Sequence, residues 1–470
     1  MVMPAARRRR SIWLLIAIVA SLPAFCGGCA MNARFNIDRI HRDAAARRTR
    51  APLIFIHGFV GAKLRHRDTH ETVWGRFIDA IKRGRTEDLR LPIASPVMSE
   101  NRDDLEPFDI YDKVAGVDFY AGILDTLGEA GGYTMGDIND PRPGDDCFVF
   151  YYDWRRDNVE SAGELGRAIR RLKSRLGTPE ARFDVVAHSM GGLIAEYYLK
   201  YGSRDVLGDP GASPTYAGAR DINRLVLIGT PRRGTITALE ALHLGISRSL
   251  DPATLFTMPS IYQLLPSDAT SRFVTPDGTP IDVDLFDAGS WVRYGWSIFN
   301  RSRKSDERQR ATDGGESLAR ETSFLQHALD RAQLFHRALE REDGAASPVP
   351  THVFGSDCVP TLDRVILHET RSGYTILFDD DAGPGRSRRD LDQVLFVPGD
   401  GTVTAGSLLA IDAEDPLQFS QGPVTSTYLF CETHGLLPSH RGFQDNLFHV
   451  LFHSPPQPAP AALDPAPAGP

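Results

Sequence analysis

One short stretch near the middle of the chain limits the folds it can adopt more than any other. Residues 183–187 form a mostly apolar run, and residues 188–192 read His-Ser-Met-Gly-Gly. A run of this length predicts a buried strand, and the helical pattern that follows at 191–201 requires a tight turn between strand and helix. The chain therefore contains a strand–turn–helix unit with a serine, Ser189, at the turn.

Similar apolar runs on either side of this unit predict further buried strands. They lie at residues 52–56, 148–152 and 225–228, and apolar residues recur at helical spacing between 162 and 176. Strands that alternate with helices predict βαβ units and a mostly parallel central sheet, so the expected fold class is α/β. An apolar content of 41% supplies a large core and excludes disorder of the whole chain.

Residues 187–191 (AHSMG) have the small-x-Ser-x-Gly pattern of a nucleophile elbow. A serine hydroxyl is a weak nucleophile, so it must be held on a sharp turn within reach of a base. We therefore predict an α/β-hydrolase with cap and lid insertions in which Ser189 is the nucleophile. The alternative is a turn serine in a binding protein of the same fold.

The loop after the first predicted strand, residues 56–61 (IHGFVG), is the expected site of an oxyanion hole. In α/β-hydrolases one donor is a backbone N–H of this loop, and the other belongs to the residue after the nucleophile. We predict that the backbone N–H groups of Phe59 and Met190 are these donors. His57 is expected to be a structural residue of the loop.

The acid should come after Ser189 in the sequence. Asp400 follows a predicted strand at 394–397 and lies between two glycines, so its carboxylate is free to contact an imidazole. The alternative for Asp400 is an ordinary turn residue, since Gly-Asp-Gly is also common turn chemistry. Asp287 and Asp392 are weaker candidates for the acid.

The base should follow the acid. His434 comes directly after a predicted strand at 428–431, where the catalytic histidine of this fold is expected. His440 is the alternative base, or else a cap of the helix predicted to begin near residue 442. His449 and His453 lie in or beyond that helix and are expected to be structural.

No cofactor, metal ion or protein partner is predicted. The sequence lacks the metal-binding pattern H-E-x-x-H and the phosphate-binding pattern G-x-x-x-x-G-K-[ST]. The 53 basic and 61 acidic residues give a net charge of −8, so we expect no binding to nucleic acid.

The N-terminus has the pattern of a targeting segment. Residues 7–10 are all arginine, and the apolar run at 12–25 is shorter than the roughly 20 residues that a spanning helix needs. We predict a secretory signal peptide over residues 1–29, which would place the folded part outside the cytoplasm. A retained anchor helix is the alternative.

Residues 26–30 (CGGCA) resemble a bacterial lipoprotein processing site, at which Cys29 would carry the lipid anchor. Ordinary cleavage after Ala30 is the alternative. A linker is expected at residues 30–50. Three later cysteines allow one disulfide and one free thiol, but the sequence does not say which pair forms. They are Cys147, Cys358 and Cys431.

The hydrolase domain is expected over residues 51–453, with two insertions. The first, at about 65–143, is predicted to be a cap that binds membranes, and the second, at about 232–348, a lid. Residues 454–470 are rich in Pro and Ala, which predicts a disordered tail.

Several segments together resemble the lecithin:cholesterol acyltransferase and lysosomal phospholipase A2 family. They occur in family order at 57–61 (HGFVG), 152–156 (YDWRR), 187–191 (AHSMG), 228–231 (IGTP), 259–266 (PSIYQLLP) and 399–403 (GDGTV). The resemblance implies that Ser189 attacks a glycerophospholipid ester and that the acyl group passes to water or to an alcohol. It also implies that the region around Trp74 binds a lipid surface; core packing is the alternative for Trp74.

The chain departs from the animal members of this family in two places. His57 stands where they have proline, and the cysteine pair that brackets their membrane-binding insertion is absent between residues 65 and 143. Two further functions stay open at this point. One is an esterase or triacylglycerol lipase that acts on neutral esters, and the other is a non-catalytic binding lipoprotein with the same fold.

Overall fold

The computed structural model describes residues 36–37, 39–41, 50–75, 87–111, 113–114, 117–247, 250–267, 272–300, 307–341, 347–371, 373–378, 393–411 and 424–453. The chain divides into two units, residues 1–36 and 37–470, and everything described below belongs to the second. The predicted signal peptide, Cys29 and the tail at 454–470 lie outside the described residues. No described helix is long and apolar enough to cross a membrane.

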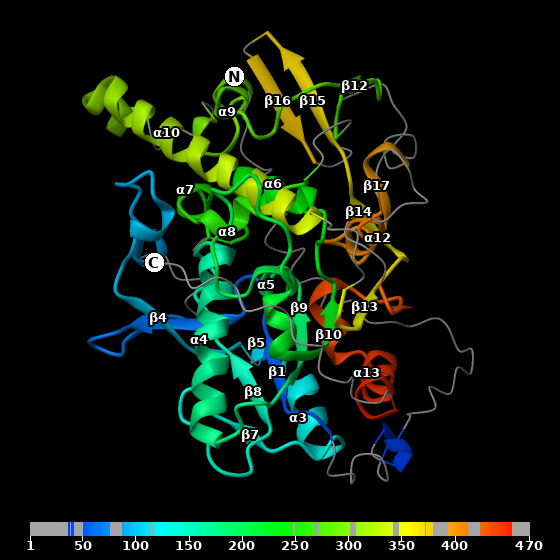
Figure 1. The fold of residues 1–470 in the computed structure, drawn as a ribbon. Coiled ribbons are helices and arrows are strands. Elements are labelled where there is room, and N and C mark those ends of the chain that lie inside the picture. The colour runs from blue at the N-terminus through cyan, green and yellow to red at the C-terminus, as the bar shows by residue number, and fades with distance from the viewer. Residues whose placement is uncertain are drawn as a thin grey trace. The chain divides into compact units, whose positions relative to one another are not determined.

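A seven-stranded parallel sheet forms the centre of the second unit (Figure 1). Every pair of neighbouring strands in it runs parallel, which confirms the predicted α/β class. In spatial order the strands are β18 (Ser426–Leu429), β13 (Thr351–Gly355), β10 (Ile222–Ile228), β9 (Phe183–His188), β1 (Leu53–Ile56), β8 (Cys147–Phe150) and β7 (Met135–Gly136).

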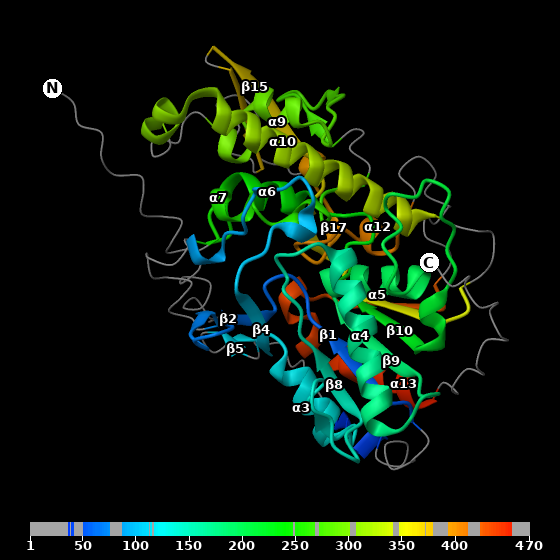
Figure 2. The same ribbon diagram turned by 60° about the vertical axis from the view of Figure 1, so that its left-hand side comes forward.

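Alternate side chains of these strands enter two separate apolar cores, because successive residues of a strand point to opposite faces. Ile54 and Ile56 belong to the core beneath α4 (Asn158–Leu176) and α5 (Met190–Tyr201). Leu53 and Phe55 belong to the core beneath α3 (Ala121–Glu129) and α13 (Arg441–His453). The sheet is therefore buried on both faces, with the two pairs of helices on opposite sides (Figure 2).

The first predicted insertion contains a small antiparallel sheet and part of the core. The sheet consists of β3 (Thr72–Trp74), β2 (Ala62–His66) and β4 (Leu105–Ile110). Between β3 and β4 the chain forms η1 (Glu87–Leu89) and η2 (Met98–Glu100), and after β4 it forms β5 (Lys113–Val114) and β6 (Val117–Asp118). The end of the predicted insertion belongs to the core fold, because α3 packs on the central sheet and β7 is its edge strand.

The second predicted insertion forms a helical layer in the upper part of Figure 1. It contains α6 (Ile236–Leu244), α7 (Pro252–Leu255), α8 (Pro259–Tyr262), α9 (Ala288–Tyr294), η4 (Ser297–Phe299) and α10 (Glu307–Glu340). Beside them lies a four-stranded sheet of β12 (Pro280–Ile281), β11 (Phe273–Val274), β15 (Val365–Thr370) and β16 (Gly373–Leu377). Arg331 of α10 pairs with Asp157 at 2.5 Å, and Asp157 also caps α4, so this layer is tied to the core.

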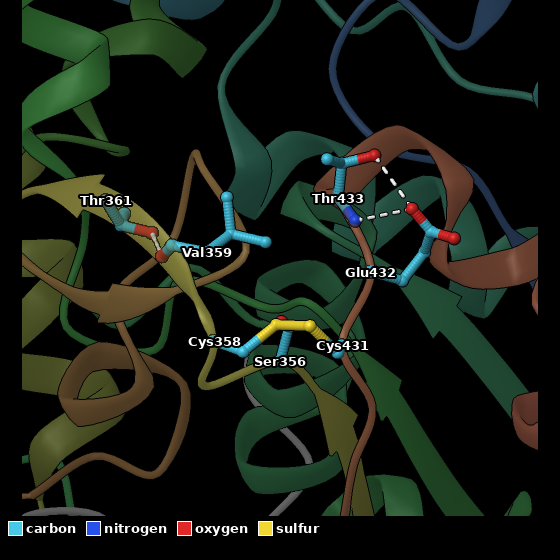
Figure 3. The surroundings of a disulfide bond; sticks show 7 residues. All are labelled: Ser356, Cys358, Val359, Thr361, Cys431, Glu432 and Thr433. Carbon is cyan, nitrogen blue, oxygen red and sulfur yellow. Dashed lines mark hydrogen bonds between the residues drawn. A yellow bond between two sulfur atoms is a disulfide. The ribbon is translucent and has the colours of Figure 1, made fainter. Parts of the chain in front are cut away.

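The remaining elements connect the last strands of the central sheet. β14 (Val359–Leu362) pairs with β17 (Phe396–Gly399) in an antiparallel ladder, and α12 (Ala405–Leu408) and η5 (His434–Ser439) follow. A disulfide joins Cys358 to Cys431, which follow neighbouring strands of the central sheet (Figure 3). Cys147 is a buried free thiol, and burial raises its pKa well above the ordinary value.

Candidate active site

Ser189 lies on a strained turn between β9 and α5. Its φ angle is +55°, a conformation that non-glycine residues rarely adopt. The turn closes tightly, since a Cβ on Gly191 would come within 2.4 Å of the His57 carbonyl oxygen. Glycine is therefore required at position 191, and the small-x-Ser-x-Gly pattern follows from this contact.

His434 lies between Ser189 and Asp400. Its Nε2 atom is 2.9 Å from the Ser189 hydroxyl, and its Nδ1 atom is 2.7 Å from an Asp400 carboxylate oxygen. The three residues come from sequence positions far apart, and the structure brings all three together. His434 begins η5, a few residues after β18 of the central sheet.

The Asp400 carboxylate is buried and firmly held. One oxygen accepts hydrogen bonds from the backbone N–H groups of Thr402 and Val403, and the other faces His434. Burial alone would raise the pKa of Asp400, but His434 and these hydrogen bonds outweigh it, so the pKa lies below its ordinary value. An ionised Asp400 accepts a hydrogen bond from the Nδ1–H group of His434, which leaves Nε2 without a proton and able to accept that of Ser189.

Asp400 reaches this position from the two-stranded antiparallel sheet of β14 and β17 and not from the central sheet. Residues 393–395 are helical, and the strand expected at 394–397 is instead β17, at Phe396–Gly399. The Asp400 carbonyl oxygen also accepts a hydrogen bond from the His434 backbone N–H at 2.9 Å. The acid and the base are therefore joined by a backbone contact as well as by their side chains.

Phe59 and Met190 carry the two backbone N–H groups that are predicted to form the oxyanion hole. Met190 is the first residue of α5, so its N–H has no partner within the helix. Among the described residues, neither the Phe59 nor the Met190 N–H donates a hydrogen bond. The loop of Phe59 is strained at Val60, where φ is +58°, and the Trp74 ring nitrogen donates to the Val60 carbonyl oxygen at 3.3 Å.

The other histidines and acids considered from the sequence lie elsewhere. His57 is fully buried and stacks on Tyr152 with 4.2 Å between ring centres, and burial lowers its pKa to about 4. His440 accepts a hydrogen bond from the Phe443 backbone N–H at the start of α13. Asp287 caps α9. Asp392 lies outside the described residues.

A cavity of about 410 Å³ opens over Ser189. Its walls are almost entirely apolar and come from the core and from both predicted insertions. The apolar residues of the walls include Phe59, Trp74, Phe119, Ala241, Ile261 and Leu264. The site therefore offers an apolar substrate group a place beside the serine.

Trp74 contributes to this cavity from within the protein. It is only 7% exposed and packs against Trp154 with ring centres 5.7 Å apart. Trp74 itself therefore packs in the core, as the alternative predicted, while lipid binding by the region around it stays a prediction. Trp154 belongs to the Tyr-Asp-Trp-Arg segment, whose Arg155 pairs with Asp153 at 2.7 Å and with Asp103 at 2.5 Å. These buried pairs hold the first insertion against the end of β8.

Two polar residues of the site were not identified from the sequence. Tyr120 and His188 line the same cavity, and their side chains are joined by a hydrogen bond of 2.8 Å. Tyr120 lies in the stretch assigned to the first insertion, 68 residues before His188. No local pattern indicates a contact between residues so far apart.

Comparison with known proteins identifies the fold. No family model and no curated protein matches the sequence. The solved structure of the Tle4–Tli4 complex is similar over 85% of this chain and 98% of the matched chain, with a TM-score of 0.54 and 15% sequence identity. The chain has the α/β-hydrolase fold.

Weaker similarities reach other solved structures. EstA from Clostridium botulinum shares 14% identity over 86% of this chain and 88% of its own, with a TM-score of 0.35. The mature form of the Bacillus licheniformis lipase BlEst2 shares 11% identity over 86% of this chain and 93% of its own, with a TM-score of 0.31. Membership of the lecithin:cholesterol acyltransferase and lysosomal phospholipase A2 family stays a prediction.

Proposed function

We propose that this chain is a serine enzyme that cleaves lipid esters through an acyl-serine intermediate. The observation that carries the proposal is the hydrogen-bonded series Ser189–His434–Asp400 beneath an apolar cavity. A non-catalytic binding protein has no need for a strained serine in contact with an oriented imidazole.

The reaction follows from the positions of these groups. His434 Nε2 takes the Ser189 proton as the serine oxygen attacks the ester carbonyl carbon. The Phe59 and Met190 N–H groups stabilise the resulting oxyanion, and each such donor contributes roughly 2.7–4 kcal/mol in the transition state. His434 then protonates the leaving alcohol, and an ester with Ser189 remains.

A second step releases the acyl group. Water or an alcohol attacks the acyl-Ser189 carbonyl while His434 removes its proton. Water yields a free acid, and an alcohol yields a new ester. The enzyme therefore acts as a hydrolase or as an O-acyltransferase according to which acceptor reaches the cavity.

The apolar cavity and its rim support a lipid substrate at a membrane surface. Ile246 lines the cavity and is 51% exposed, and its neighbour Leu244 is 54% exposed. Leu436, directly after the cavity residue Gly435, is 38% exposed. Exposed apolar side chains around a cavity mouth favour contact with a lipid surface. The family resemblance favours a glycerophospholipid as the ester.

We place this activity outside the cytoplasm. The arginine-rich and apolar pattern of the N-terminus supports export, and Cys29 is the proposed lipid anchor. The Cys358–Cys431 disulfide agrees with an oxidising compartment, because structural disulfides are rare in the cytosol.

The test is lipid mass spectrometry on phosphatidylcholine vesicles that contain a long-chain alcohol, with the Ser189→Ala variant as control. We expect lysophospholipid from the wild type alone, and the acyl group in the free acid or in the new ester. Equal product in both samples would contradict the role of Ser189. Cleavage of triacylglycerol but not of phosphatidylcholine would replace the phospholipid with a neutral ester.

A further inference from the structure

We infer that the hydroxyl group of Tyr120 is a positioning group that holds the oxyanion loop against the nucleophile turn. This inference rests on the function proposed above. Tyr120 is 3% exposed and directly precedes α3, and its hydroxyl oxygen lies 2.9 Å from the Gly58 backbone nitrogen and 2.8 Å from Nδ1 of His188. Gly58 precedes the proposed oxyanion donor Phe59, and His188 precedes Ser189.

The direction of each hydrogen bond is determined by chemistry. The Gly58 N–H only donates, so the Tyr120 oxygen accepts from it. The carbonyl oxygen of His434 only accepts, so a neutral His188 has its proton on Nε2 and its Nδ1 accepts the hydrogen bond of the Tyr120 hydroxyl. The Nε2–H group of His188 donates to this carbonyl oxygen at 3.2 Å. Burial, together with the nearby His434, lowers the pKa of His188 to about 3, so the ring stays neutral in this role.

This series of hydrogen bonds joins the three segments that contain the oxyanion loop, the nucleophile and the base. It runs from Gly58 through Tyr120 and His188 to the backbone of His434. A shift of the Tyr120 hydroxyl therefore changes the relative positions of the oxyanion loop, the nucleophile and the base together.

The orientation of the Phe59 N–H depends on the hydrogen bonds of both the N–H group and the carbonyl group of Gly58. The Gly58 carbonyl oxygen accepts hydrogen bonds from Nδ1 of His57 at 2.8 Å and from the Gly61 N–H at 3.1 Å. In a trans peptide the following N–H points away from this carbonyl, so the Phe59 N–H is left for the substrate. Tyr120 accepts a hydrogen bond from the N–H group of Gly58. The peptide group between Gly58 and Phe59 therefore has little freedom to rotate.

The space around Gly58 allows no compensation by movement toward the nucleophile. A Cβ on Gly58 would lie 2.8 Å from the Cβ of Ser189, so the loop backbone already contacts the serine. A loop released by loss of the Tyr120 hydroxyl would therefore move away from Ser189. Such a movement weakens stabilisation of the oxyanion more than it weakens binding of the substrate.

The test compares Tyr120→Phe with a matched control, Tyr201→Phe. Tyr120→Phe keeps the ring contacts with Phe55 and His188 and removes only the hydroxyl. Tyr201 is also buried, and its hydroxyl donates to the Ala338 carbonyl oxygen at 2.8 Å, at the end of α5 away from Ser189. Tyr120→Phe loses the two hydrogen bonds that it contributes to the proposed series, and Tyr201→Phe loses a buried hydrogen bond outside that series.

Three quantities are measured on each variant: kcat and KM for a soluble short-chain ester, the rate at which a fluorophosphonate modifies Ser189, and the thermal unfolding midpoint. For Tyr120→Phe we expect kcat and the fluorophosphonate rate to fall about 10- to 100-fold, with KM within about twofold. For Tyr201→Phe we expect a lower unfolding midpoint with both rates near wild type.

The outcomes separate the inference from the proposed function. Modification of wild-type Ser189 that Ser189→Ala abolishes supports the function, whatever Tyr120→Phe does. Wild-type rates in Tyr120→Phe, or equal losses in both tyrosine variants, would overturn the positioning role alone. An unmodified wild type would overturn the proposed function, and the positioning role with it.

Discussion

The apolar cavity over Ser189 leads to a quantitative prediction about the length of the acyl chain in the substrate. Burial of one methylene group in an apolar site contributes about 0.8 kcal/mol, and about 1.36 kcal/mol corresponds to a tenfold change in rate. Each methylene that enters the cavity should therefore raise kcat/KM about fourfold. An octanoyl ester should react about 200-fold faster than a butanoyl ester, since four more methylenes contribute about 3 kcal/mol.

The substitution Ala241→Phe tests where the acyl chain of the substrate lies in the cavity. Ala241 is on α6, lines the cavity and is 8% exposed, so a larger side chain at this position enters the space above Ser189. We expect Ala241→Phe to react with a butanoyl ester within about twofold of wild type and to lose most of the gain for the octanoyl ester. The butanoyl ester is the internal control for folding and for the catalytic groups.

The assay is initial-rate hydrolysis of p-nitrophenyl esters from two to ten carbons, each below the concentration at which it forms micelles. The active enzyme is counted by fluorophosphonate titration. A flat dependence on chain length in the wild type would refute the assignment of the cavity to the acyl chain. An unchanged dependence in Ala241→Phe would refute the placement of the chain beside α6.

Three further predictions concern the groups around the cavity. In Asp400→Asn we expect kcat for a soluble ester to fall about 10⁴-fold with a similar KM, because Nδ1 of His434 loses its carboxylate acceptor. A loss of kcat below tenfold would contradict the role of Asp400. The double variant Cys358→Ser/Cys431→Ser lacks the disulfide, which closes a loop with a sequence separation of 73. Its free energy of unfolding in a urea titration should be about 2–4 kcal/mol lower than that of wild type. An unchanged unfolding midpoint would contradict this prediction. The His57 pKa is lowered to about 4, so the unfolded chain binds more protons below pH 6.5 and stability falls as the pH drops from 7 toward 4. In urea titrations at pH 7 and pH 5 this decrease should be smaller in His57→Gln, and an equal decrease would show that His57 is not the cause.

The parts of the site that local pattern controls could be predicted from the sequence. The turn at Ser189 needs a strand, small residues and a helix in succession, and all of these are adjacent in the chain. The placement of His434 after β18 follows from the same reasoning about strand ends. Each of these features depends on residues that are close together in the chain, so it can be predicted from the sequence alone.

The parts that depend on distant contacts could not be predicted. Asp400 follows β17, which pairs with the distant strand β14 outside the central sheet, and the partner of Cys358 is fixed only when β13 and β18 lie side by side. Strand β13 could not be predicted, because it begins with Thr351 and His352 and only Val353 and Phe354 are large apolar residues. The contact between Tyr120 and His188 likewise exists only once α3 packs on the sheet.

The central claim is that an acyl group passes from a lipid ester to Ser189, and trapping that intermediate tests it most directly. Wild type is mixed with phosphatidylcholine vesicles, quenched in acid within seconds and digested, and the peptide that contains Ser189 is measured by mass spectrometry. The account predicts a fraction of this peptide that carries an acyl chain of the supplied lipid, and none in Ser189→Ala. Release of lysophospholipid with the acyl group on another residue, or with unaltered activity in Ser189→Ala, would contradict it.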